Sequence, residues 1–238
     1  MYDIVITGAD RGLGYALCEV FVEKGWRVFA GQFMADWPQL GELKAKWGDM
    51  LHIISLDVSS DASVKAAGEY VASVTDKVDM LINNAGVGGR GEGSLFNDEP
   101  FDSRSPLLPY NTNALGMMRV TEALFPLLEK GEKRLCFVSS EAGSIAPGHR
   151  KEGFGYTMSK TSINMGVRLV FNALRPKGFK IRLYNPGWMR SYMGGKKSTV
   201  GKLEPEESAQ VAYKQFTEDR AWEDALVLLD NNDQQWSI

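Results

Sequence analysis

The sequence contains few of the side chains that form disulfides or bind transition metals. Among 238 residues there are two cysteines, Cys18 and Cys136, and two histidines. Two cysteines inside periodic or apolar stretches make a poor disulfide framework, so a reducing, cytoplasmic location is expected. The cysteines and histidines also lack the spacing of a zinc site, and no metal site is expected.

Long hydrophobic runs and an excess of positive charge are also missing. No apolar run approaches the roughly 18 residues that a membrane-spanning helix needs, and the N-terminus shows no signal-peptide pattern. Lysine and arginine number 27 against 30 aspartates and glutamates, which gives a net charge of −3. Such a chain has no global positive field to gather phosphates. We therefore expect neither a membrane nor a nucleic acid as partner.

The sequence does contain a regular alternation of short apolar runs and longer stretches with helical spacing. Hydrophobic residues make up 44% of the chain, which is enough for a sizeable core. The runs have the length of buried strands, which must be covered on both sides. They lie at Asp3–Thr7, Arg27–Ala30, Leu51–Leu56, Val78–Asn83, Arg134–Ser139, Phe179–Tyr184 and Ala225–Leu229. The pattern predicts one α/β domain over residues 1–238, a doubly wound, seven-stranded parallel sheet with helices on both faces.

Two long irregular stretches, residues 87–109 and 188–203, are rich in Gly, Pro, Asp and Ser. Long loops in a compact domain are usually functional, and ligands of open parallel sheets bind beyond the carboxyl ends of the strands. Because both stretches follow strands, they are predicted to form the walls of a substrate site. The alternative is that they are surface connectors without a ligand.

A glycine-rich segment follows the first apolar run directly and opens a helix. It reads Thr7-Gly8-Ala9-Asp10-Arg11-Gly12-Leu13-Gly14, with the spacing Gly-x-x-x-Gly-x-Gly. Gly8 allows a tight turn, Gly12 lets the backbone approach a diphosphate, and Gly14 permits close packing of helix on strand. The phosphates then lie at the positive N-terminus of the helix. This position between strand and helix predicts a dinucleotide-binding loop.

The spacing differs from the Gly-x-Gly-x-x-Gly of most dinucleotide folds, and it resembles that of the short-chain dehydrogenase/reductase family. Further markers follow in that family's order over nearly the whole chain: Asp57, Asn83-Asn84-Ala85-Gly86, Asn113, Ser139-Ser140, Tyr156-x-x-x-Lys160 and Asn185-Pro186-Gly187. The resemblance implies a Rossmann-type domain with a bound nicotinamide dinucleotide. The residues assigned to the cofactor are Gly8, Asp10, Arg11, Gly12, Leu13, Gly14, Gln32, Asp57, Val58, Asn84, Ala85, Gly86, Tyr156, Lys160, Pro186, Gly187, Met189 and Ser191.

Tyr156 and Lys160 lie four residues apart in a stretch with helical spacing that continues to Arg175 and ends at Pro176. Residues i and i+4 share one face of a helix, so the phenol and the ammonium stand together. A free phenol with a pKa of about 10 is a poor base at neutral pH, and a neighbouring ammonium favours its anion. This chemistry and the resemblance both make Tyr156 the general acid/base, with Lys160 also hydrogen-bonding the nicotinamide ribose. The alternative is a surface helix with an ordinary tyrosine and lysine.

The resemblance adds two further catalytic residues. Ser140 is followed by x-x-Gly, as is the family's serine that donates to the substrate oxygen, although Ser139 is an adjacent alternative. Asn113 also precedes x-x-Gly, which selects it over Asn111 as the asparagine that holds a water connecting the lysine to solvent. The polar stretch from Pro147 to Gly153 departs from the family pattern as a lengthened loop.

The choice of cofactor depends on the end of the second strand and on the glycine loop. An acidic residue at that strand end would accept the ribose hydroxyls of NAD, but Gln32 and Phe33 stand there. Arg11 occupies a position where family members that favour NADP often carry a basic residue, and a guanidinium suits a phosphate. Asp57 and Val58 are expected against the adenine, with a helix cap as the other role of Asp57. NADP(H) is therefore the expected cofactor, with NAD(H) as the alternative.

The substrate is less constrained by the sequence. Pro186, Gly187, Met189 and Ser191 belong to a segment that in the family closes over the nicotinamide amide. Trp188, Tyr192, Met193 and Phe154 are candidates for an apolar pocket, although aromatics are more often packing residues. No fixed charge in the sequence points clearly into this pocket, so a small neutral carbonyl compound or alcohol is expected.

Three hypotheses for the function follow. The first is an NAD(P)H-dependent oxidoreductase of carbonyls and secondary alcohols. The second is a non-catalytic dinucleotide-binding sensor or scaffold, and the third is an epimerase or dehydratase of the same fold. The presence of Asn113, Ser140, Tyr156 and Lys160 together favours an enzyme, because a binder needs only the glycine loop. The resemblance also suggests a homo-oligomer, a dimer or tetramer, formed through the Asn113 and Tyr156 helices.

Overall fold

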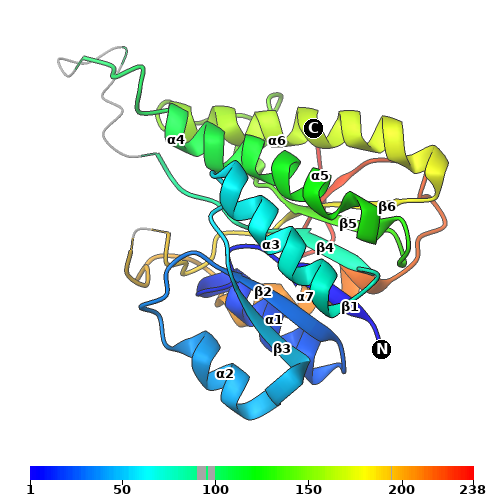
Figure 1. The fold of residues 1–238 in the computed structure, drawn as a ribbon. Helices are drawn as coiled ribbons and strands as arrows, with labels where there is room; N and C mark the ends of the chain where they lie inside the picture. The colour runs from blue at the N-terminus through cyan, green and yellow to red at the C-terminus, as the bar shows by residue number, and fades with distance from the viewer. Residues whose placement is uncertain (90–94, 96–99, 194) are drawn as a thin grey trace.

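In the computed structural model, which describes residues 1–89, 95, 100–193 and 195–238, the strands form one central sheet. Its order is β3-β2-β1-β4-β5-β6-β7-β8 (Figure 1). The strands are β1 (Asp3–Ile6), β2 (Arg27–Gln32), β3 (Leu51–Ser55), β4 (Met80–Asn83), β5 (Arg134–Val138), β6 (Lys180–Asn185), β7 (Leu228–Asp230) and β8 (Gln235–Trp236). Strands β1 to β7 are parallel, as the sequence pattern predicts.

The eighth strand is a difference from the seven strands expected. Strand β8 pairs antiparallel with β7, with Trp236 opposite Leu228. The Trp236 indole N–H donates to Asp230 Oδ2 at 3.0 Å, which fixes the short hairpin. A strand of two residues has no hydrophobic run of its own, so the sequence carries no period-2 signal for it.

Helices connect the parallel strands and cover both faces of the sheet. They are α1 (Gly12–Glu23), α2 (Gln39–Trp47), α3 (Asp61–Val74), α4 (Leu107–Pro109), α5 (Gly116–Leu128), α6 (Phe154–Leu174) and α7 (Pro205–Thr217). Helix α1 ends one residue before Lys24, and Gly25 follows with φ +82°, the left-handed conformation that ends many helices. Helix α6 spans the predicted helix, and Pro176 lies in the 3₁₀ turn after it. None of the described helices combines the length and hydrophobicity needed to cross a bilayer.

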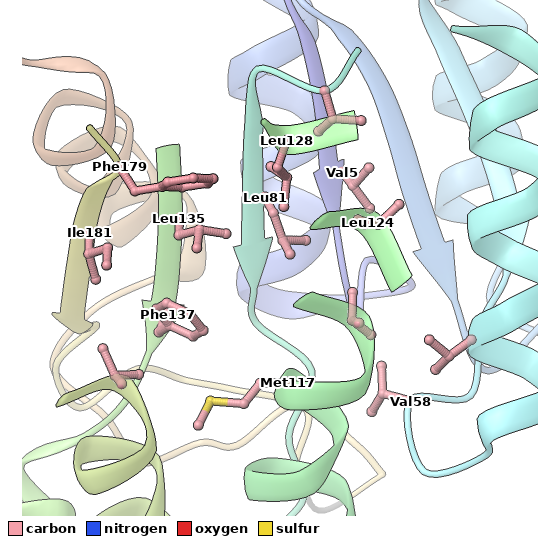
Figure 2. Close-up of a cluster of buried hydrophobic side chains, with 14 of the residues drawn as sticks. Val5, Val58, Leu81, Met117, Leu124, Leu128, Leu135, Phe137, Phe179 and Ile181 are labelled. Atoms are coloured by element: carbon pink, nitrogen blue, oxygen red, sulfur yellow. The ribbon is translucent and has the colours of Figure 1, made fainter. Parts of the chain in front are cut away.

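The strands are apolar on both sides because each side faces its own core. Ile4 and Ile6 of β1 pack with Leu17 of α1 and Phe216 of α7 on one face. Val5, between them, points to the opposite face and packs against Leu124 of α5 (Figure 2). Figure 2 also shows Leu81 of β4 and Leu135 and Phe137 of β5 in this second core. The alternation of side chains along a strand therefore builds both cores from one continuous apolar run.

The strand order reverses next to β1, which lies between β2 and β4. In doubly wound sheets such a reversal opens a crevice at the carboxyl ends of the strands, where ligands bind. The segments with functional motifs all leave the sheet at this edge: the glycine loop after β1, Asn84 after β4, Ser140 after β5 and Pro186 after β6. The topology thus brings together residues that are far apart in the sequence.

Candidate active site

The glycine loop after β1 has a backbone that other residues adopt with strain. Gly8 has φ +64° and Gly12 has φ +58°. A Cβ on Gly14 would lie 2.0 Å from the Gly8 carbonyl oxygen, so the first turn of α1 rests directly on the loop. A Cβ on Gly12 would have Tyr192 Cδ2 as its nearest described neighbour, at 3.7 Å, which leaves the backbone open to an approaching group. The loop is thus tight on its inner side and accessible at Gly12.

The N-terminus of α1 fits a diphosphate. Its N-cap residue, Arg11, makes no capping hydrogen bond with its side chain, and the first turn contains no acidic residue. The first backbone N–H groups of a helix have no partner within the helix, and they carry the positive end of its dipole. These features together match the diphosphate group of a pyridine dinucleotide.

Asn84 holds the glycine loop in place. Its side-chain amide donates to the carbonyl oxygens of Thr7 at 2.9 Å and Gly8 at 3.1 Å. The Thr7 hydroxyl in turn accepts from the backbone N–H groups of Asn84 and Ala85, both at 3.0 Å. A Cβ on Gly8 would lie 2.7 Å from Ala85 Cα. Sequence reasoning expects Asn84, Ala85 and Gly86 at the cofactor. The structure shows that Asn84 also positions the glycine loop. Thr7, which sequence reasoning did not single out, helps to hold the same loop.

Asp10 and Arg11 connect the loop to the end of β2. Asp10 Oδ1 accepts from the Phe33 backbone N–H at 3.0 Å, and Oδ2 pairs with Arg11 Nη1, also at 3.0 Å. The Arg11 guanidinium lies over the Trp37 ring, 4.9 Å from its centroid. Trp37 packs edge-to-face on Tyr192, with centroids 5.3 Å apart. Arg11 is thus held between an aromatic face and a carboxylate at the strand end where Gln32 and Phe33 stand.

Asp57 organises the turn after β3. Its Oδ1 accepts from the backbone N–H and the hydroxyl of Ser59, at 2.8 and 2.6 Å. Ser60 supplies the cap of α3, since its hydroxyl accepts from the Ser63 N–H at 3.3 Å. The role as helix cap considered for Asp57 therefore belongs to Ser60, and Asp57 forms the turn before it. Val58, the next residue, is buried.

Tyr156 and Lys160 lie in the first two turns of α6 and share a face of the helix. Lys160 Nζ lies 5.6 Å from the centroid of the Tyr156 ring. The lysine is 4% exposed, and its ammonium donates to the Val138 carbonyl at the end of β5, at 3.0 Å. Burial lowers the pKa of Lys160 to about 8, against a smaller opposite effect of Glu141. Desolvation of the charged ammonium is the physical cause.

The phenol of Tyr156 is shifted in the direction opposite to the one that sequence reasoning expects. Burial raises the pKa of Tyr156, the hydrogen bond with the Ser140 side chain lowers it, and the charge of Glu141 raises it. The expected decrease assumes that the Lys160 ammonium faces the phenol oxygen. In the structure that ammonium is bonded to Val138, so it provides little stabilisation for a tyrosinate.

Ser140 lies at the carboxyl end of β5, with a charged pair beside it. Its hydroxyl donates to Glu141 Oε2 at 2.5 Å and accepts from the Ala142 N–H at 3.1 Å. The other carboxylate oxygen of Glu141 pairs with Arg150 in the lengthened loop. Burial alone raises the pKa of Glu141, but the hydrogen bonds from Ser140 and Arg150 outweigh it and hold the pKa below its ordinary value. Sequence reasoning missed this charge; the only signal was an acidic residue directly after the serine.

Ser139, the neighbour considered as an alternative to Ser140, has a different environment. Its hydroxyl donates to Asn164 Oδ1 of α6 at 2.6 Å and is buried. Ser139 therefore attaches α6 to the sheet, and Ser140 is the serine that influences the pKa of Tyr156.

Asn113 lies in a π-helical segment, Tyr110–Leu115, just before α5. Its side chain donates to the Val87 carbonyl and to the Ser159 hydroxyl, both at 2.9 Å, and accepts from the Val87 N–H at 2.8 Å. The side chain thus joins the segment after β4 to α6, one residue before Lys160. Asn111 instead receives a hydrogen bond from Arg119 Nη2 at 2.8 Å. π-Helical segments often occur at functional sites.

The segment after β6 returns across the same edge. Gly187 has φ +77°, and its N–H donates to Asn185 Oδ1 at 3.2 Å. The Pro186 carbonyl accepts from the buried Ser208 hydroxyl at 2.9 Å. Farther along, Ser191 accepts from the Ser198 N–H at 2.9 Å, which closes the loop on itself. Pro186, Gly187, Met189 and Ser191 are therefore held at the edge where the resemblance places the nicotinamide amide.

The two predicted substrate loops approach each other at this edge. A Cβ on Gly88 would lie 3.4 Å from the Met193 sulfur, and Phe101 packs edge-to-face on Phe154 with centroids 5.6 Å apart. Trp188 is 61% exposed, so it does not pack in a core in this structure. Residues 90–94 and 96–99 of the first loop and residue 194 of the second lie outside the described residues. Among the residues that are described, no group of His, Cys, Asp and Glu has the arrangement of a metal site.

Comparisons with known proteins agree with this geometry. Residues 3–200 match the family described as short chain dehydrogenase. An uncharacterized oxidoreductase of Schizosaccharomyces pombe is 30% identical over 234 residues, 95% of this chain and 89% of that protein. The C-signal protein of Myxococcus xanthus is 40% identical over 127 residues, 53% of this chain and 74% of that protein. A carbonyl reductase from Pseudomonas aeruginosa PAO1, solved in complex with NADP, superposes with a TM-score of 0.83, 27% identity and coverage of 100% of both chains.

The family match covers most of the chain, and the parallel sheet with a glycine loop directly after β1 agrees with it. The chain therefore belongs to the short-chain dehydrogenase family of NAD(P)-dependent oxidoreductases.

Proposed function

We propose that this protein is an NADP(H)-dependent reductase that interconverts a small neutral carbonyl compound and its alcohol, with Tyr156 as general acid/base. The observation that carries the proposal is the position of Lys160 Nζ, 5.6 Å from the centroid of the Tyr156 ring on the same face of α6. Ser140, at the carboxyl end of β5, is close enough for its side chain to lower the pKa of Tyr156. All three residues lie at the sheet edge that also carries the dinucleotide loop. The carbonyl reductase from Pseudomonas aeruginosa with bound NADP, similar over its whole length, supports the same class of reaction.

The proposed chemistry needs a proton donor and a stabilised oxygen. The bound nicotinamide supplies the hydride. Tyr156 gives its proton to the substrate oxygen as the alcohol forms. The Ser140 hydroxyl, which donates to Glu141 Oε2 in this structure, would redirect its proton to the same oxygen. Burial raises the pKa of Tyr156, so the phenol keeps the proton that it would donate.

Lys160 has a holding role in this proposal. Its pKa of about 8 leaves it mainly protonated at neutral pH, and it is anchored by the Val138 carbonyl. From this position it would hydrogen-bond the nicotinamide ribose. Asn113 fixes the start of α6 through Ser159, which keeps Lys160 and Tyr156 in register with the segment after β4. A water held by the Asn113 backbone would complete the path from Lys160 to solvent.

The preference for NADP(H) over NAD(H) rests on Arg11. Its guanidinium stacks on Trp37 at the end of β2, and neither Gln32 nor Phe33 supplies a carboxylate that would repel a 2′-phosphate. A planar guanidinium group can donate two parallel hydrogen bonds to two oxygens of one phosphate. Asp10 pairs with Arg11, so the carboxylate would orient the guanidinium while leaving part of its donors for the phosphate.

A second copy of this chain is proposed as the protein partner. Met158, Met165 and Leu169 of α6 are 60%, 62% and 62% exposed, and their spacing places them along one side of the helix. An exposed apolar stripe of this kind is typical of an interface. We therefore propose a homo-oligomer that forms through α6. We also propose a cytoplasmic location.

The test compares wild type with Tyr156→Phe. Oxidation of NADPH and NADH is followed by nicotinamide absorbance with a panel of neutral ketones and aldehydes, and cofactor affinity is measured by fluorescence titration. We expect the variant to bind NADPH as wild type does and to lose at least about a hundredfold in kcat, the usual contribution of a general acid. Equal turnover in both proteins would refute the proposed mechanism. NADPH binding without turnover in either protein would favour a non-catalytic sensor.

A further inference from the structure

Two aromatic side chains, Trp37 and Tyr192, connect the segments that follow β2 and β6 at the glycine loop. Trp37 lies between β2 and α2, and Tyr192 lies in the predicted substrate loop, residues 188–203. Their rings pack edge-to-face with centroids 5.3 Å apart. A Cβ on Gly12 would lie 3.7 Å from Tyr192 Cδ2, so the contact stands beside the accessible part of the glycine loop. Trp37 and Tyr192 therefore form an aromatic bridge between the cofactor side and the substrate side of the site.

The same tryptophan supports the guanidinium of Arg11. The Arg11 Cζ lies over the Trp37 ring, 4.9 Å from its centroid. Arg11 Nη1 donates to Asp10 Oδ2 at 3.0 Å and to the Met34 sulfur at 2.8 Å. Among the described residues, Arg11 Nε and Nη2 have no hydrogen-bond partner. These two nitrogens form the edge of a guanidinium that donates two parallel hydrogen bonds, so that edge is left for a phosphate.

We propose that Trp37 is a positioning residue for the binding of the 2′-phosphate of NADP(H), and that Tyr192 holds Trp37 in place from the substrate loop. Asp10 fixes one end of the Arg11 guanidinium, and the Trp37 ring fixes its plane. A group that is oriented in advance loses less conformational freedom when it binds. This inference rests on the proposed preference for NADP(H), and it makes that preference depend on the substrate loop.

The aromatic bridge should affect one cofactor more than the other. NADPH carries a 2′-phosphate where NADH carries a hydroxyl, and both carry the diphosphate that is proposed to bind the first turn of α1. A change that disturbs the glycine loop as a whole would weaken both cofactors alike. A change that only misdirects the Arg11 guanidinium would weaken NADPH. The ratio of the Kd for NADH to the Kd for NADPH, called the selectivity below, therefore separates positioning from general structural support.

The chain supplies a matched control at the opposite edge of the sheet. Trp222 lies under Arg220, whose Cζ is 4.7 Å from the ring centroid. Asp219, at the start of the same segment, pairs with Arg134, the first residue of β5. This segment thus lies at the amino ends of the strands, whereas the proposed cofactor site lies at their carboxyl ends. Trp222→Leu removes the same kind of contact far from that site.

The experiment uses the full chain and measures the Kd for NADPH and for NADH by isothermal titration calorimetry. This readout requires neither turnover nor tryptophan fluorescence. The variants are Arg11→Ala, Trp37→Leu, the double variant Arg11→Ala/Trp37→Leu, Tyr192→Leu, Tyr192→Phe and Trp222→Leu. Tyr192→Phe keeps the ring that packs on Trp37, so it is the control for Tyr192→Leu.

We expect the selectivity to fall about three- to fivefold in Trp37→Leu, the size of effect that one cation–π contact supplies. In Tyr192→Leu it should fall about twofold, and in Tyr192→Phe and Trp222→Leu it should equal that of wild type. Once Arg11 is replaced by alanine, Trp37→Leu should have no further effect on the selectivity, because Trp37 acts through the guanidinium.

A selectivity that falls in Arg11→Ala but not in Trp37→Leu would overturn this inference alone. Equal losses in Tyr192→Leu and Tyr192→Phe, or additive losses in the double variant, would also contradict it. If Trp37→Leu fails to fold, Tyr192→Leu decides by the same ratio. An unchanged selectivity in Arg11→Ala would refute the proposed basis of the NADP(H) preference together with this inference. A wild type that turns over no carbonyl would refute the proposed reaction, and the Kd ratios would still decide the role of the aromatic bridge.

Discussion

The contact between Gly14 and the glycine loop allows a prediction that separates cofactor binding from overall stability. A Cβ on Gly14 would lie 2.0 Å from the Gly8 oxygen, 2.6 Å from Asn84 Nδ2 and 2.8 Å from the Gly8 carbonyl carbon. Nonbonded heavy atoms of this kind rest at about 3.5 Å, so Gly14→Ala must move the start of α1 by about 1 Å or more. The same movement breaks the bonds by which Asn84 holds the loop.

The cost can be compared with a matched alanine substitution. Overpacking of this type costs about 1–3 kcal/mol, against a gain of about 1 kcal/mol from replacing glycine inside a helix. A Cβ on Gly41 of α2 would meet none of the described residues within 4 Å, so Gly41→Ala makes the same propensity gain without a clash. We expect Gly14→Ala to be less stable than Gly41→Ala by roughly 1–3 kcal/mol.

Gly14→Ala should also weaken the binding of NADPH, an effect that Gly41→Ala should not share. The first-turn amides of α1 are the proposed diphosphate donors, so a displaced helix start misdirects them. We expect the Kd for NADPH to rise at least about tenfold in Gly14→Ala, which corresponds to about 1.4 kcal/mol, and to be unchanged in Gly41→Ala. Denaturant unfolding and fluorescence titration measure the two quantities. A Gly14→Ala protein that is as stable as Gly41→Ala and binds NADPH like wild type would refute the reasoning.

Three further predictions concern the cofactor, the buried lysine and the exposed face of α6. Arg11→Ala should raise the Kd for NADPH about tenfold or more and leave the Kd for NADH within about twofold, because the guanidinium is proposed to bind the 2′-phosphate. An equal loss of affinity for NADPH and NADH would contradict that role. The pKa of Lys160 is lowered from 10.5 to about 8 on folding, so the unfolded chain binds more protons between these values, and wild type should gain stability as the pH rises through this range. Urea unfolding of Lys160→Met should lack this gain, and an identical pH dependence in both proteins would contradict it. Met165→Glu places a charge on the exposed face of α6, where Met165 is 62% exposed. Light scattering should then detect assemblies of lower mass than those of wild type. An unchanged mass would argue against an interface through α6.

Local patterns in the sequence were sufficient for the seven parallel strands and for α1 and α6, because each strand coincides with a short run rich in apolar residues and each helix has apolar spacing. They also located Gly8, Gly12 and Gly14, whose spacing reflects backbone requirements within a few residues. The proximity of Tyr156 and Lys160 could be predicted as well, because residues four apart in a helix lie one turn from each other. The cofactor contacts assigned to the strand ends remain predictions.

Only the tertiary structure decided how the groups at the strand ends affect one another. The Arg150 guanidinium reaches Glu141 because the loop before α6 lies beside the turn after β5. The Lys160 ammonium donates to the Val138 carbonyl because α6 lies against the end of β5. The two-residue strand β8 forms only because β7 is already in place beside it. Desolvation and long-range contacts leave no periodic signal in a sequence, whereas helix faces, strand runs and tight turns do.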